Sequence, residues 1–164
     1  MIHVPETSET RLFRFALTLA APILLAGILL PRDAQSQRRK EDDETPVFRE
    51  YRGVQIGMTA DEARKKLGGP KEKGEEQDFF VLNDNETAQI VYDKDHKVVT
   101  ISADFVSGAT GTPTPNVVFG SEIAPKPDGS MYKMVRYTKA GFWVSFSRTA
   151  GNSPMTSVTI QKLQ

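Results

Sequence analysis

The sequence predicts an α+β domain in which a short helix packs on one face of an antiparallel, meander-like β-sheet of about six strands. Three observations lead to this prediction. The stretch from Thr59 to Pro70 carries a full set of helix signals, the later segments alternate apolar and polar residues, and short turn sequences separate those segments. Alternation gives a sheet one apolar and one polar face, so the helix is expected on the apolar face.

The helix is expected over residues 60–67. Thr59 is in the N-cap position, and Glu62 three residues later completes a capping box. Gly68 suits the residue after the last turn, and Pro70 prevents the helix from continuing. A helix of two turns is unstable alone in water, so it must pack on the sheet.

Six strands are expected, over residues 78–82, 87–92, 97–105, 131–137, 142–147 and 156–163. In the third of these, Val99, Ile101, Ala103 and Phe105 are assigned to the apolar face. Between the third and fourth strands lies a long segment, residues 107–130, rich in Gly, Pro, Ser and Thr, with a short strand expected at 117–119. Loops of this length are often functional or mobile.

The N-terminus predicts export. Arg11 and Arg14 precede an apolar run over residues 15–30, and Ala34-Gln35-Ser36 offers small residues to a signal peptidase, so residues 1–36 are assigned as a signal peptide. An uncleaved membrane anchor is the alternative. Pro22 interrupts the apolar run, which is short against the roughly 20 residues that a membrane span needs.

The segment 37–47 is dominated by charged residues and is assigned as a disordered linker, which leaves 48–164 as a single domain. The chain has 21 Lys and Arg against 21 Asp and Glu, so it lacks the basic field that nucleic-acid binding requires. It has no cysteine, which excludes disulfides, thiolate metal sites, cysteine nucleophiles and a lipid-modified N-terminal cysteine.

A family resemblance rests on the run Ile56-Gly57-Met58-Thr59, the helix positions up to Pro70, and the segment 90–98 (IVYDKDHKV). These motifs resemble the SmpA/OmlA family, small envelope lipoproteins that accompany the outer-membrane β-barrel assembly machinery. The resemblance covers about Gly53–Ser102 and implies a β-lactamase-inhibitor-protein-like fold. The lipid-bearing cysteine of that family is missing here, so outer-membrane anchoring is not implied.

No catalytic constellation is evident, and no cofactor or metal site is expected. His96 lies beside Asp93 and Asp95, but this pattern favours a hairpin turn in which an Asp side chain caps its own backbone. Residues 83–86 (NDNE) lack the spacing of a calcium loop. Ser145 and Ser147 alternate on a strand with no histidine to activate them. A glycosidase-like pair of carboxylates stays open as an alternative.

The candidate binding residues are Tyr132, Met134, Arg136 and Trp143. If Lys139 and Ala140 form a two-residue turn between the strands 131–137 and 142–147, Arg136 faces Trp143 across the two strands, and all four side chains share one face. Aromatic, Met and Arg side chains are the residue types of interface hot spots. The alternative is that the long loop 107–130 partly buries Trp143.

The expected function is an exported, non-catalytic protein-binding module of the bacterial cell envelope, periplasmic or secreted, linked to outer-membrane assembly or maintenance. Its expected partner is another envelope or secreted protein, with no nucleic acid and no integral membrane span after signal cleavage. The alternatives are a secreted enzyme inhibitor acting through the loop 107–130, a small hydrolase using acidic residues, and an envelope protein held by an uncleaved leader.

Overall fold

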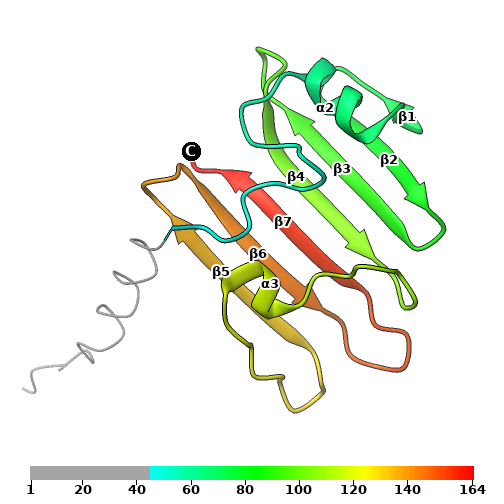
Figure 1. Ribbon diagram of the computed structural model, residues 1–164, viewed down its shortest axis with the longest axis vertical. Coiled ribbons are helices and arrows are strands. Elements are labelled where there is room, and N and C mark those ends of the chain that lie inside the picture. Colours follow the sequence, from blue (N-terminus) through cyan, green and yellow to red (C-terminus); the bar gives the residue numbers. More distant parts are fainter. Residues whose placement is uncertain (1–44) are drawn as a thin grey trace, which may run out of the picture. The chain divides into compact units, whose positions relative to one another are not determined.

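The computed structural model describes residues 45–164, which form one seven-stranded antiparallel sheet with two short helices (Figure 1). The signal peptide assigned to 1–36 and most of the linker assigned to 37–47 lie outside the described residues. The fold is mostly β, with seven strands where the sequence predicts about six. Within the described residues, no helix is long and apolar enough to cross a membrane.

The strands are β1 (Glu72–Lys73), β2 (Gln77–Asn83), β3 (Glu86–Tyr92), β4 (Val98–Phe105), β5 (Met131–Tyr137), β6 (Phe142–Arg148) and β7 (Thr156–Lys162). Six of them match the predicted ranges to within one residue at each end, and the two-residue β1 is additional.

The spatial order of the strands is β1-β2-β3-β4-β7-β6-β5, so the sheet is not a simple meander. Two meanders, β1 to β4 and β5 to β7, meet where β7 pairs with β4 (Figure 1). The long connection after β4 carries the chain to the far edge of the sheet, and the second meander then returns toward the centre. This leaves β5 as one edge strand and β1 as the other.

The helix α2 (Ala60–Leu67) has the predicted bounds and the predicted capping box. The Thr59 side chain accepts a hydrogen bond from the backbone N–H of Glu62, and the Glu62 carboxylate accepts one from the N–H of Thr59. At the other end, the N–H of Gly68 donates to the carbonyl of Arg64. Local sequence alone therefore accounts for where this helix begins and ends.

The second helix, α3 (Pro115–Phe119), replaces the short strand predicted at 117–119, so that prediction is wrong. Thr114 accepts a hydrogen bond from the N–H of Val117, Pro115 stands at the start of the helix, and Gly120 ends it in the left-handed conformation with φ of 71°. The β-branched residues of this segment favour a strand, but the cap, the proline and the glycine together favour a helical turn more strongly.

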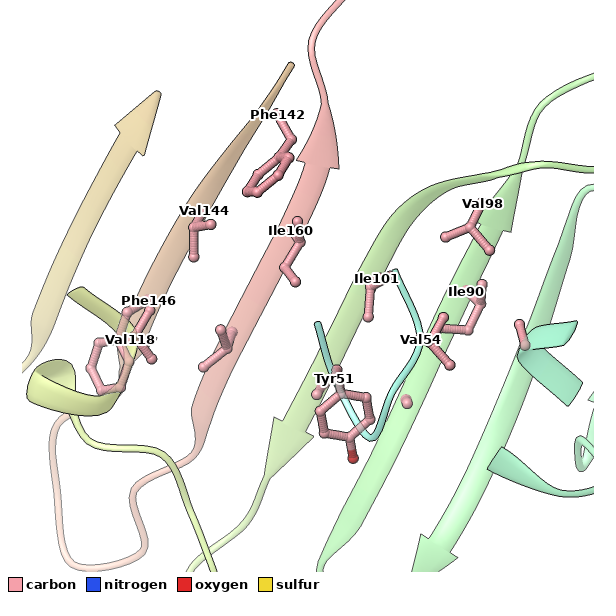
Figure 2. Packing of buried hydrophobic residues seen from close by; sticks show 14 of the residues in the cluster. Tyr51, Val54, Ile90, Val98, Ile101, Val118, Phe142, Val144, Phe146 and Ile160 are labelled. Atoms are coloured by element: carbon pink, nitrogen blue, oxygen red, sulfur yellow. The ribbon is translucent and has the colours of Figure 1, made fainter. Parts of the chain in front are cut away.

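The hydrophobic core lies between one sheet face and a cover made of α2, α3 and the segment 51–58. Figure 2 shows the buried side chains of this face, with Tyr51 and Val54 of the covering segment beside the strands and Val118 of α3 beside Phe146. Phe142, Val144 and Phe146 extend this core along β6. The sheet is therefore covered on one side, as its alternating sequence predicts.

One strand differs in its register from the predicted alternation. A register irregularity between β3 and β4 falls beside Val98, which is fully buried, while Val99 is only half-buried. Val99 was assigned to the apolar face and Val98 takes that place. From Ile101 onward the predicted alternation holds, with Ala103 and Phe105 in the core.

Candidate functional site

The four candidate binding residues lie together on the uncovered face of the β5–β6 hairpin. Arg136 is directly opposite Trp143 in the ladder, while Met134 is opposite Ser145 and Tyr132 is opposite Ser147. Tyr132 and Met134 are 55% and 42% exposed, Arg136 is exposed and Trp143 is half-buried. We call Tyr132, Met134, Arg136 and Trp143 the hairpin strip.

The register of this hairpin is the one that the sequence predicts. Its turn contains four residues, Thr138–Gly141, where two were predicted, but the centre of the turn is the same, so the register is unchanged. Tyr137 faces Phe142 on the core side with their ring centres 6.0 Å apart. Because side chains alternate along a strand, pairing Tyr137 with Phe142 in the core places Arg136 and Trp143 together on the uncovered face.

Trp143 has strand neighbours on both sides. Arg136 of β5 and Gln161 of β7 are its partners in the two ladders. The centre of the long loop forms α3, whose Val118 and Phe119 are buried in the core on the other face of the sheet. The ordered centre of this loop therefore packs away from Trp143.

Two buried carboxylates lie on the covered face, and sequence reasoning identified neither. Asp78 of β2 is fully buried. Its carboxylate accepts hydrogen bonds from Arg64 Nε at 2.8 Å, Tyr92 Oη at 2.7 Å and the N–H of Gly74 at 3.0 Å. Burial alone would raise the pKa of Asp78, but the Arg64 and Tyr92 hydrogen bonds outweigh it, so the pKa lies below its ordinary value.

Glu86 of β3, 4% exposed, has a similar set of partners. It accepts hydrogen bonds from Tyr51 Oη at 2.6 Å, from Arg52 Nη2 at 2.6 Å and from Asn83 Nδ2 at 3.0 Å. Burial opposes ionisation of Glu86, yet the bonds from Arg52 and Tyr51 lower its pKa. Burial and the hydrogen bond to Glu86 raise the pKa of Tyr51, against the opposing effect of Arg52.

The two carboxylates share no partner, and each ties a covering segment to the sheet. Asp78 holds α2 through Arg64, and Glu86 holds the segment before α2 through Tyr51 and Arg52. A general acid at neutral pH needs a raised pKa, whereas both of these carboxyl groups have lowered ones. Their geometry fits a structural role.

The turn at His96 has the geometry that the sequence predicts. The Asp93 carboxylate accepts hydrogen bonds from the backbone N–H groups of Asp95 and Lys97 at 3.0 and 2.9 Å. These bonds lower the pKa of Asp93, the one from Lys97 most. His96 is exposed and has a φ of 54°. Across residues 45–164, no three His, Asp or Glu side chains are grouped so that they could hold a metal ion.

A pocket of about 460 Å³ lies where the start of the long loop meets the ends of β4, β5, β6 and β7. Phe105, Phe146 and Thr156 form part of its lining, together with Glu122 and Arg148. Its volume is in the range of small-molecule sites. The composition of the segment 107–130 marked this loop as a candidate, but the residues that complete the pocket come from four strands and could not be assembled from sequence.

Comparison with known proteins adds no relative to this description. The chain matches no protein-family model, no curated protein and no solved structure. The resemblance to the SmpA/OmlA family therefore stays a prediction from its motifs.

Proposed function

We propose that this protein is an exported, non-catalytic protein-binding module of the bacterial cell envelope, and that the hairpin strip is its binding surface. The observation that supports this proposal is the grouping of Tyr132, Met134, Arg136 and Trp143 on the uncovered face of an edge hairpin.

The chemistry of the hairpin strip differs from that of the sheet centre. Side by side on the same face, β6 and β7 present small hydroxyl side chains: Ser145, Ser147, Ser157 and Thr159. A hydroxyl surface of this kind gains little from leaving water. The strip, in contrast, offers a large aromatic ring, a flexible thioether and a guanidinium group within a few residues, which is the composition that concentrates binding energy.

The charge distribution favours an acidic partner surface. No Asp or Glu occurs after Asp128, whereas the same stretch contains five basic residues: Lys133, Arg136, Lys139, Arg148 and Lys162. Four of these five lie in the β5–β6 hairpin or its turn. In a chain with no net charge, this end of the sheet is locally basic, which accelerates association with an acidic surface.

The cellular setting of the proposal comes from the N-terminal sequence and the motif resemblance. The basic and apolar segments before residue 36 favour export to the periplasm or the exterior. The SmpA/OmlA-like motifs within Gly53–Ser102 suggest a role in outer-membrane assembly or maintenance. On this proposal the partner is another envelope or secreted protein.

The proposal is tested by site-specific photo-crosslinking in intact cells. A photoreactive phenylalanine analogue replaces Met134 in the strip, or Val81 as the control, because Val81 is 51% exposed on the same face at the other end of the sheet. We expect one dominant adduct to a different protein from position 134, distinct in mass from two cross-linked copies of this chain. This adduct should be lost when Arg136→Ala and Trp143→Ala are added, and position 81 should give none. Equal adducts from both positions, or none from position 134, would contradict the proposal.

A further inference from the structure

The edge strand β5 has a strand neighbour on one side only within the described part of the chain. The directions of the backbone groups on β5 can be derived from those on its neighbour β6. Just before β6, the Gly141 carbonyl accepts a hydrogen bond from the N–H of Leu163, on the β7 side. Backbone groups alternate in direction along a strand. The N–H and C=O groups of Trp143, Ser145 and Ser147 therefore point toward β7, as the Gly141 carbonyl does, and those of Phe142, Val144 and Phe146 point toward β5.

The same alternation applies on β5. Val135 and Tyr137 lie opposite Val144 and Phe142, whose backbone groups point toward them. The residues between, Tyr132, Met134 and Arg136, consequently direct their N–H and C=O groups away from the sheet. These are the three residues of β5 whose side chains are exposed on the uncovered face. Within residues 45–164 they therefore present an open backbone edge and a recognition face at once.

Of the features that commonly block pairing between sheets, β5 has charged side chains, Lys133 and Arg136, but no proline and no bulge. The ladder between β5 and β6 runs over seven residue pairs without a register shift, and β5 contains no proline. At the opposite edge, β1 is only two residues long and exposed. A long, regular edge is a template for another strand, and shortening or interrupting the edge is the usual protection.

The sequence of β5 is complementary to itself in the antiparallel direction. If two copies pair with Met134 opposite Met134, then Tyr132 of each copy lies opposite Arg136 of the other, twice over. Lys133 lies opposite Val135, so no like charges face each other. A guanidinium beside an aromatic ring is a favourable cation–π pair. A register centred on Arg136 would instead place two guanidinium groups directly opposite, which is destabilising.

We propose that the protein forms a two-fold symmetric dimer in which the β5 strands of two copies pair antiparallel about Met134. The outward N–H and C=O groups of Tyr132, Met134 and Arg136 then complete the ladder between the copies. A two-fold axis requires a self-complementary surface, and this register supplies one. The pairing also places the two hairpin strips next to each other on one continuous face.

The proposal does not depend on the strip's binding an envelope partner, because it uses the backbone edge. Its decisive variant is Met134→Pro. Proline removes one N–H, and that of Met134 points away from β6, so the ladder within each copy is preserved. Met134→Ala is the matched control, since it shortens the same side chain but keeps the N–H. Circular dichroism and thermal melting of both variants establish that they are folded.

The measurement is sedimentation equilibrium. The protein is expressed as the full chain and purified as the cell leaves it after any processing. We expect a monomer–dimer equilibrium whose dissociation constant rises on the order of 30-fold or more in Met134→Pro, because two hydrogen bonds across the axis are lost. Met134→Ala should change it much less. A monomer at every concentration, or a dimer unaffected by proline, would overturn the proposal.

Hydrogen exchange of the unmodified protein provides a second test that needs no variant. The amides of Tyr132, Met134 and Arg136 should become protected as protein concentration rises, while those of β1, at the other edge, should not change. If the three amides exchange at the same rate at low and high concentration, the proposed pairing is wrong. Because this test uses only the unmodified protein, it remains valid even if Met134→Pro fails to fold.

Discussion

The carboxylate of Asp78 and the guanidinium of Arg64 form an ion pair of 2.8 Å in which the acid is fully buried and the base is 19% exposed. This ion pair connects α2 to β2 across the covered face, and its two residues are 14 positions apart in sequence. Arg64 also contacts the exposed carboxylate of Asp61 at 3.2 Å. One arginine thus joins a buried and an exposed acid, which allows their contributions to be compared directly.

Removing Arg64 should therefore be costly. Arg64→Met keeps an unbranched apolar stem but leaves the Asp78 charge buried without its cation, and we expect the free energy of unfolding to fall by about 3–5 kcal/mol. Urea denaturation measures this change. Asp61→Ala is the control, because it removes the exposed partner of the same arginine and should leave the midpoint unchanged. Equal effects of the two substitutions would contradict the structural role of Asp78.

Stability should depend on acid pH through Asp78 and Glu86. Both groups have a lower pKa in the folded protein than their ordinary values, chiefly because hydrogen bonds from Arg64, Arg52 and two tyrosines outweigh burial. The stabilisation is therefore present above the ordinary carboxyl pKa of about 4 and is lost as pH falls below it, through the folded-state values. The urea concentration at the midpoint of unfolding, measured from pH 6 to pH 2, should decrease as the pH drops through that window. In the Asp78→Asn, Glu86→Gln double variant the decline should be shallower, and an identical profile would argue against the assignment.

Trp143 and Phe146 lie on the same strand but on opposite faces, so truncating each should have a different consequence. Phe146 is 1% exposed in the core, and Phe146→Ala should cost about 3–5 kcal/mol of folding free energy. Trp143→Ala removes a half-buried ring from the uncovered face, and we expect a loss of about 1–2 kcal/mol. Thermal melts of both variants decide this. If Trp143→Ala is as destabilising as Phe146→Ala, the ring belongs to the structural core.

Binding by the hairpin strip can be separated from that stability effect. With a partner identified by crosslinking, Trp143→Ala and Arg136→Ala should each weaken binding by about 2 kcal/mol or more, the usual size of a hot-spot effect. Isothermal titration calorimetry on folded variants measures the change. Val81→Ala, at the other end of the same face, should bind as the unmodified protein does.

His96 carries a backbone strain that glycine would relieve. Its φ of 54° lies in the left-handed region, which residues other than Gly occupy only at a cost. His96→Gly should raise the free energy of unfolding by about 1 kcal/mol, because the exposed side chain makes no core contact and the strain disappears. His96→Val should lower it, since a β-branched side chain tolerates this conformation poorly. Chemical denaturation of the two variants should move in opposite directions.

The structure also shows which features were beyond sequence reasoning. Nothing in the sequence pattern indicated that Asp78 and Glu86 are buried. Their burial became visible only with Arg64, Tyr92, Tyr51 and Arg52 placed around them. The segment 46–52 offered no secondary-structure signal, yet it contributes Tyr51 to the core and to the Glu86 cluster.

By itself, the sequence determined the features that depend on neighbours a few residues away. The bounds of α2, six strand ranges and the β5–β6 register all follow from caps, turns and alternation, which act over one helical turn or one hairpin. Only the tertiary structure decided the pairing of β7 with β4, the burial of Asp78 and Glu86, and the position of β5 at an edge. These features join residues far apart in the chain, and their energy comes from burying surfaces together, which no local pattern specifies.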